Sequence, residues 1–289
     1  MLILMNFAAD LDSIAIKKLS AYGYAPNPQD TARLRFNMLY TLTQRVIPQQ
    51  QYTVEFSTEL LENPKYEQFH AEVDEIVQCL RVAADMTPYL SKKAPEFDAR
   101  DPLLLQGGIH HLHLNSVSTV GTDRFVARAF GKAELLFLRI ENGTAHLIDI
   151  RSHSDSNRFV GTQLLEIVDR NWPHLHFAPV GVTGNVFSEA TIKDLRKINV
   201  NYALEINGRA INPTMGLMTD GTPLEAIMQF DHLTTLLSSL ETDIRKQFRK
   251  YFLHPSKQFN ADVRLVAYDG KSCTILERIS NQITSIEFR

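Results

Sequence analysis

Apolar side chains recur at three- and four-residue spacing through the first hundred residues, which is the pattern of amphipathic helices. Asp30 can cap one such helix, and Asn63 followed by Pro64 provides the cap and first-turn proline of another. The apolar run within residues 1–10 predicts a first strand or a buried segment. We therefore expect residues 1–100 to form a mainly helical N-terminal domain.

Strand patterns dominate residues 101–180, which we expect to form a second domain. Residues 109–115 alternate apolar and polar side chains, whereas 133–140 are nearly all apolar, as in a central strand covered on both faces. Asn142-Gly143 predicts a tight hairpin turn. The predicted order is strands at 109–115, 125–130, 133–140 and 144–151, then a helix at 162–172.

A third region, residues 181–289, combines strands with one long helix. Thr222-Pro223-Leu224-Glu225 is a capping box with proline at the first helical position, and the helix behind it can continue to Phe252. The other predicted elements are a helix at 188–199 and strands at 202–207, 263–268, 273–277 and 282–288. The chain is thus predicted to be α+β, with a small antiparallel sheet between a helical N-terminal region and a C-terminal α+β unit.

Composition changes this picture little. An apolar fraction of 44% and a charged fraction of 22% are ordinary for a soluble globular protein. With a net charge of −3, the chain as a whole has no positive field that would attract nucleic acid. This net charge does not exclude a basic patch on one face. Cys79 and Cys273 match no metal spacing and are expected as thiols in a reducing compartment. No apolar run is long enough to span a membrane, so we expect a cytoplasmic protein.

Histidines are concentrated in the predicted central domain, where seven of the ten lie between residues 110 and 176. Successive side chains of a strand point to opposite faces, so each histidine strand has an apolar face and a polar face. In the strand 144–151 this alternation places His146 on the apolar face with Ile148 and Ile150. If both strands belong to one sheet, five polar groups converge on its other face: His111, His113, Asp149, Arg151 and His153.

Such a face has the ingredients for cleaving RNA without a metal. Attack by the ribose 2′-hydroxyl needs a general base, a general acid and positive charge at the phosphorane. Two imidazoles can take the first two roles, because one can be charged while the other is neutral. Arg151, with Arg139 or Arg128, can supply the charge, and Asp149 can orient a histidine.

Two segments resemble the core of RelE-family bacterial toxins, small α+β ribonucleases that cut mRNA, typically on the ribosome, without a metal. Residues 133–143 are similar to the family's central hairpin, and residues 149–155 resemble the ending of the YafQ-type branch. The resemblance covers roughly residues 105–160. It implies that His153 is the general acid or base and that His111 or His113 matches the active-site histidines of the preceding strands.

The resemblance also implies how the substrate is held. Phe159 would stack on a base, and Arg128 and Arg158 are further candidates for substrate contacts. The predicted partners are RNA, including ribosome-bound mRNA, and an antitoxin or trigger protein, as expected for a toxin or phage-defence effector; homo-oligomerisation stays open. We expect no cofactor, because the sequence holds no G-x-G-x-x-G or Walker-type loop, and no membrane association.

Two other classes of function remain open. In the first, His111-Leu112-His113 and His174-Leu175-His176 each provide two imidazoles on one side of a strand. The two pairs together, or one pair with His153 and Asp149, would ligate zinc or manganese in a hydrolase. No H-E-x-x-H motif supports this reading. In the second, the histidines are structural and the chain is a non-catalytic interaction protein.

Overall fold

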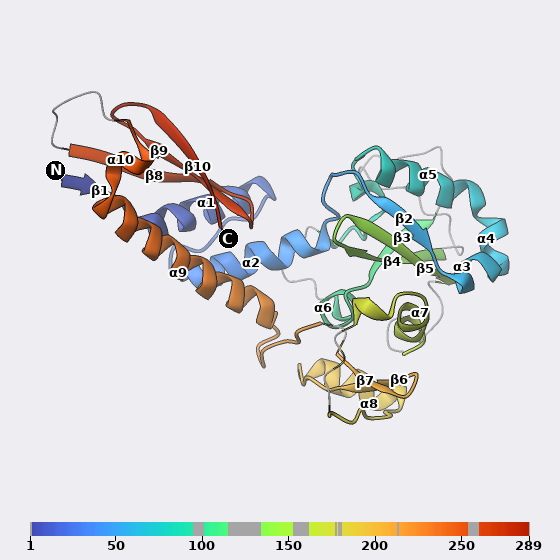
Figure 1. The fold of residues 1–289 in the computed structure, drawn as a ribbon. Coiled ribbons are helices and arrows are strands. Elements are labelled where there is room, and N and C mark those ends of the chain that lie inside the picture. Colours follow the sequence, from blue (N-terminus) through green and yellow to red (C-terminus); the bar gives the residue numbers. More distant parts are fainter. Residues whose placement is uncertain are drawn as a thin grey trace. The chain divides into compact units, whose positions relative to one another are not determined.

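The chain divides into two compact units, one of residues 1–40 with 225–289 and one of residues 41–224. We call these the terminal unit and the central unit. The division differs from the three predicted regions, because the two ends of the chain pack together instead of forming separate domains. The computed structural model describes residues 2–94, 101–114, 134–152, 162–176, 178, 181–212, 214–253 and 260–288 (Figure 1).

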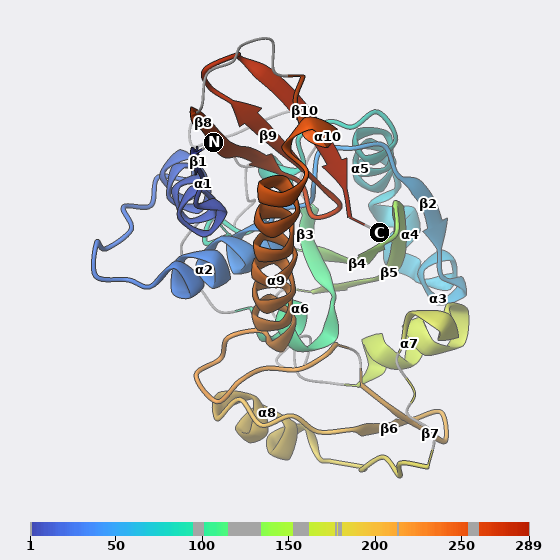
Figure 2. The same cartoon turned by 60° about the vertical axis from the view of Figure 1, so that its left-hand side comes forward.

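The terminal unit packs helices against one face of a four-stranded sheet (Figure 2). The sheet order is β1-β8-β9-β10, and β1 pairs in parallel with β8 while the other pairs are antiparallel. Alternate residues of β8, such as Val263 and Leu265, are buried, which fits the predicted C-terminal strands. The strands are β1 (Leu2–Leu4), β8 (Asn260–Tyr268), β9 (Ser272–Glu277) and β10 (Gln282–Glu287).

The helices of this unit include one that the sequence reading missed. In α1 (Phe7–Ala21) the side chain of Asn6 caps the helix by accepting a hydrogen bond from the backbone of Ala9 at 3.0 Å. The predicted long helix starts where expected, but it ends at Lys246 instead of Phe252 because Gln247 leaves the helical conformation. The other helices are α2 (Ala32–Arg45), which crosses the boundary at residue 40, α9 (Leu224–Lys246) and α10 (Phe248–Tyr251).

The central unit is built on the sheet β2-β5-β4-β3. Three of its strands are antiparallel as predicted, but β2 pairs in parallel with β5 and comes from the region expected to be helical. The predicted strand at 125–130 lies outside the described residues. The strands are β2 (Thr53–Phe56), β3 (His110–Leu114), β4 (Glu134–Glu141) and β5 (Thr144–Ser152).

Separate apolar cores cover the two faces of this sheet, and the central strand β4 contributes to both, as its uninterrupted apolar run predicts. The first face, with Leu136 and Leu138, packs on helices from residues 58–89, and the second face, with Leu135 and Phe137, packs on α6, α7 and η2 (Figure 1). The helices are α3 (Thr58–Glu62), α4 (Pro64–Gln68), α5 (His70–Arg81), η1 (Thr87–Tyr89), α6 (Pro102–Gly107), α7 (Gln163–Asn171) and η2 (Pro173–Leu175).

The rest of the central unit follows η2. A hairpin turns at Asn207-Gly208, where both residues have positive φ, as predicted for this turn. Its strands and the preceding helix are α8 (Glu189–Lys197), β6 (Leu204–Ile206) and β7 (Arg209–Ile211). Among the described residues, no helix is both long enough and apolar enough to cross a membrane.

Candidate active site

The two histidine-bearing strands belong to one sheet, as the sequence reading required. They are not neighbours, because β4 lies between them. His111 of β3 pairs with Phe137 of β4, and Phe137 pairs with Asp149 of β5. In the same way, Leu135 of β4 pairs with both His113 and Arg151. Paired residues share a face, so His111, His113, Asp149 and Arg151 lie on the second face. Two strand spacings put the Cα atoms of His113 and Arg151 about 10 Å apart.

A β-bulge in β5 places His146 on this same face, and the prediction that it faces the other way is wrong. The register shifts between Phe137 and Leu138, so that Ile148 is an extra residue in β5. The extra residue reverses the alternation for everything that precedes it. His146 therefore lies on the second face, with its ring centroid 4.8 Å from that of Trp172.

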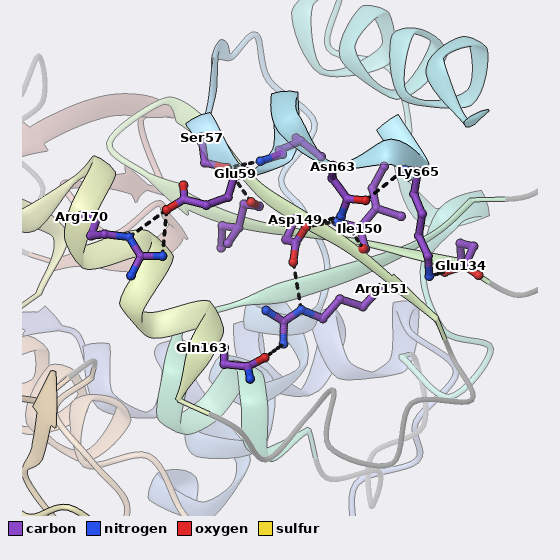
Figure 3. Close-up of polar contacts among 12 residues, drawn as sticks. Ser57, Glu59, Asn63, Lys65, Glu134, Asp149, Ile150, Arg151, Gln163 and Arg170 are labelled. Carbon is purple, nitrogen blue, oxygen red and sulfur yellow. Dashed lines mark hydrogen bonds and ion pairs between the residues drawn. The ribbon is translucent and has the colours of Figure 1, made fainter. Parts of the chain in front are cut away.

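Asp149 and Arg151 form a partly buried ion pair held by side chains from two other elements (Figure 3). Nε of Arg151 donates to Oδ2 of Asp149 at 3.0 Å, and Nη1 donates to Oε1 of Gln163 at 2.9 Å. Oδ1 of Asp149 accepts from Nδ2 of Asn63 at 2.7 Å. Oδ2 of Asp149 thus fixes the guanidinium, while Oδ1 is held by Asn63. The expectation that Asp149 orients a histidine is not met among the described residues.

The loop and helix ends around this pair are also tied to the sheet (Figure 3). Ser57 donates its hydroxyl to the carbonyl of Ile148 at the bulge, at 2.6 Å. Asn63 ends α3 and caps α4 while it holds Asp149, so one side chain joins both helices to β5. Glu59 of α3 is paired with Arg170 of α7 at 2.8 Å. The ion pair therefore sits in a rigid frame.

The histidine pair on β3 differs in access to solvent. The side chain of His111 is 16% exposed, whereas His113 is 2% exposed as a residue. Nδ1 of His111 lies 3.5 Å from Oδ2 of Asp101, which also caps α6 by accepting from the backbone of Leu104 at 3.1 Å. The two imidazole rings meet edge to face at 6.1 Å. Of the two, His111 is the more accessible to solvent.

Arg139 belongs to a second polar group on this face, nearer the other end of the sheet. It pairs in register with His146, and Nη2 donates to Oε2 of Glu141 at 3.3 Å. Burial lowers the pKa of His176 to about 4, and the positive charge of Arg139 acts in the same direction. His176 is therefore neutral at pH 7. Arg139 faces these histidines and does not join the Asp149–Arg151 pair.

The four histidines of the alternative metal site do not assemble. Within the described ranges, no three His, Cys, Asp or Glu side chains are grouped so that they could hold a metal ion. His174 lies beside His146, with ring centroids 6.4 Å apart, and Nδ1 of His176 lies 3.5 Å from Oδ1 of Asp169.

Several predicted site residues lie outside the described residues: His153, Arg128, Arg158 and Phe159. Sequence reasoning in turn missed Asp101, Asn63 and Gln163, which contact His111, Asp149 and Arg151 respectively. The sequence predicted Asn63 as a helix cap, but a capping pattern does not reveal the additional hydrogen bond to Asp149 of β5. Comparison of the chain with protein-family models, with curated proteins and with solved structures gave no match.

Proposed function

We propose that the chain is a RelE-like, metal-independent endoribonuclease that cleaves RNA by attack of the 2′-hydroxyl. The observation that carries this proposal is the register of β3, β4 and β5, which puts His111 and His113 on the same face as the Asp149–Arg151 ion pair. Histidine and a fixed guanidinium are the groups that phosphodiester cleavage without a metal requires.

Each residue has a distinct role in this proposal. His111 exchanges a proton with the substrate, and Oδ2 of Asp101 lies 3.5 Å from its Nδ1. Arg151 stabilises the phosphorane, and Asp149 with Gln163 holds the guanidinium in one orientation. His153, one residue beyond the end of β5, is the second acid or base. His113 supports His111 through its edge-to-face ring contact.

RNA integrity in a translating bacterial extract, to which the chain is added after it has been stripped of metal by dialysis against EDTA, tests the proposal. We expect the purified chain to cleave mRNA, as a known metal-free ribonuclease does in a parallel reaction. His111→Ala and His153→Ala should each slow cleavage about 100-fold or more, the usual range for an acid–base group. His232→Ala, which replaces an exposed histidine of α9, is the matched control. Intact mRNA with the wild-type chain would contradict the proposal.

The biological setting is part of the same proposal. We place the activity in the bacterial cytoplasm on ribosome-bound mRNA, as a toxin or phage-defence effector. The terminal unit, whose sheet and helices form a core of their own, would then bind the trigger or antitoxin protein. Its deletion should leave RNA cleavage intact and abolish its regulation, which a co-expression growth assay would measure.

A further inference from the structure

The end of the chain is basic, although the chain as a whole has a net charge of −3. Residues 245–289 contain nine Lys and Arg side chains against four Asp and Glu, whereas residues 1–244 contain 21 against 29. Charge that is divided so unevenly along a sequence indicates a polyanionic partner for the basic part. The whole basic segment belongs to the terminal unit, outside the candidate active site.

Two of the four acidic side chains of this segment are taken up within the fold. Glu277 is fully buried and accepts backbone N–H groups. Asp262 lies 2.7 Å from Nε of Arg264 and 3.3 Å from Nη1 of Arg278, so its charge is already offset. Cations are therefore in excess on the surface.

The cations are densest where α9 meets α10 (Figure 2). Four exposed side chains follow one another there within six residues, and we call them the basic end: Arg245, Lys246, Arg249 and Lys250. Lys250 is paired with Asp243 at 3.1 Å, whereas Arg245 donates Nη1 to the neutral carbonyl of Ile3 at 2.8 Å. Three of the four charges thus have no acidic partner among the residues that the structure describes.

The basic end stands on a rigid support. Phe248 and Phe252 are 5% and 1% exposed, and their ring centroids lie 5.2 Å apart in the core of the terminal unit. These two anchors flank Arg249 and Lys250, which are left on the solvent side of α10. Cations held on such a support lose little backbone freedom when they bind a partner.

The dipole of α9 explains only part of this charge. Its negative end stabilises Arg245 and Lys246, which lie in the last turn. Arg249 and Lys250 come after the break at Gln247, in a separate helix of four residues. Like charges so close together repel one another, and a bound polyanion removes that repulsion.

We propose that the basic end binds the phosphate backbone of single-stranded RNA, an inference that rests on the proposed nuclease function. Guanidinium and ammonium groups donate charge-assisted hydrogen bonds to phosphate oxygens. Contacts of this kind need no particular base, so the surface binds RNA of any sequence.

The basic end holds the substrate and takes no part in the cleavage step. The groups of the candidate active site belong to the central unit. Loss of the basic end should therefore raise the KM for RNA and leave kcat unchanged. Deletion of the whole terminal unit, which leaves cleavage itself intact, should raise the KM in the same way.

Binding of a 2′-O-methyl oligouridine to the full chain, measured by fluorescence anisotropy at a series of salt concentrations, tests the surface without any cleavage. Each cation that contacts a phosphate of a single strand adds about 0.7 to the slope of log Kd against log salt. Lys246→Gln/Arg249→Gln should lower this slope by about 1.4 and weaken binding about 10- to 30-fold at about 0.1 M salt. The matched control is Lys17→Gln/Lys18→Gln, which removes the same charge from exposed lysines of α1 and should leave both values unchanged.

Equal slopes for the wild type and Lys246→Gln/Arg249→Gln would overturn the proposal. So would a wild-type chain that does not bind the oligouridine, whatever the variant does. Vesicles of phosphatidylserine and phosphatidylcholine form a second arm. If binding to vesicles depends on Lys246 and Arg249 while binding to RNA does not, the basic end serves a membrane surface and the proposal is overturned. RNA binding with the expected slopes by a chain that cleaves no RNA would instead contradict the proposed nuclease and leave this surface standing.

Discussion

His110 should make the central unit sensitive to acid. It lies on β3 between the sheet and its first core, on the same face as Leu112 and Leu114, and only 9% of it is exposed. Burial lowers the pKa of His110 to about 4, and the neighbouring His111 adds to the effect. In the unfolded chain the pKa returns to about 6.5. The unfolded state therefore takes up a proton first as the pH falls.

The magnitude follows from this difference in pKa. The contribution of neutral His110 to the free energy of unfolding is fully present above pH 6.5. It falls by about 1.4 kcal/mol per pH unit between pH 6.5 and 4. Between pH 7.5 and 4.5, protonation of His110 should cost about 2 to 3 kcal/mol of the free energy of unfolding. The buried His176, whose pKa is also lowered to about 4, causes a second loss of stability over the same pH range. His110→Gln removes the first contribution and keeps the second.

Urea unfolding followed by tryptophan fluorescence measures the effect, because the single tryptophan, Trp172, is buried in the central unit. The free energy of unfolding of the wild type and of His110→Gln would be compared at pH 7.5, 6.5, 5.5 and 4.5. The variant should lose about 2 to 3 kcal/mol less than the wild type over this range. His70→Gln, which replaces an exposed histidine of α5, should follow the wild type. Equal losses in the wild type and His110→Gln would refute the reasoning.

Three further predictions concern other sites. Arg151→Lys keeps the charge but loses the fork that Asp149 and Gln163 hold, so RNA cleavage should fall about 100-fold with little change in the thermal midpoint. Glu277→Gln should lower the free energy of unfolding of the terminal unit by about 2 kcal/mol, measured with urea. The fully buried carboxylate accepts hydrogen bonds from the backbone N–H groups of Asp262, Ile279 and Ser280. An unchanged urea midpoint would count against this account. Gly216→Ala should lower the thermal midpoint more than Gly143→Ala, because both have positive φ but only the first Cβ would clash.

Local patterns determined much of this protein from sequence alone. The alternation of β3 placed His111 and His113 on one face, because successive side chains of any strand point opposite ways. Asn207-Gly208 predicted its hairpin because both residues adopt positive φ readily. The capping box before Leu224 marked the start of the long helix to within one residue. Each of these features depends on interactions within a few residues.

Only the tertiary structure decided which strands pair and where a bulge falls. The parallel pairing of β2 with β5 joins residues about ninety positions apart, and that of β1 with β8 joins the two ends of the chain. The bulge at Ile148 moved His146 to the other face, because one extra residue reverses a two-residue period. The hydrogen bond from Asn63 to Asp149 could not be predicted from sequence either, because the two residues meet only once the sheet has assembled.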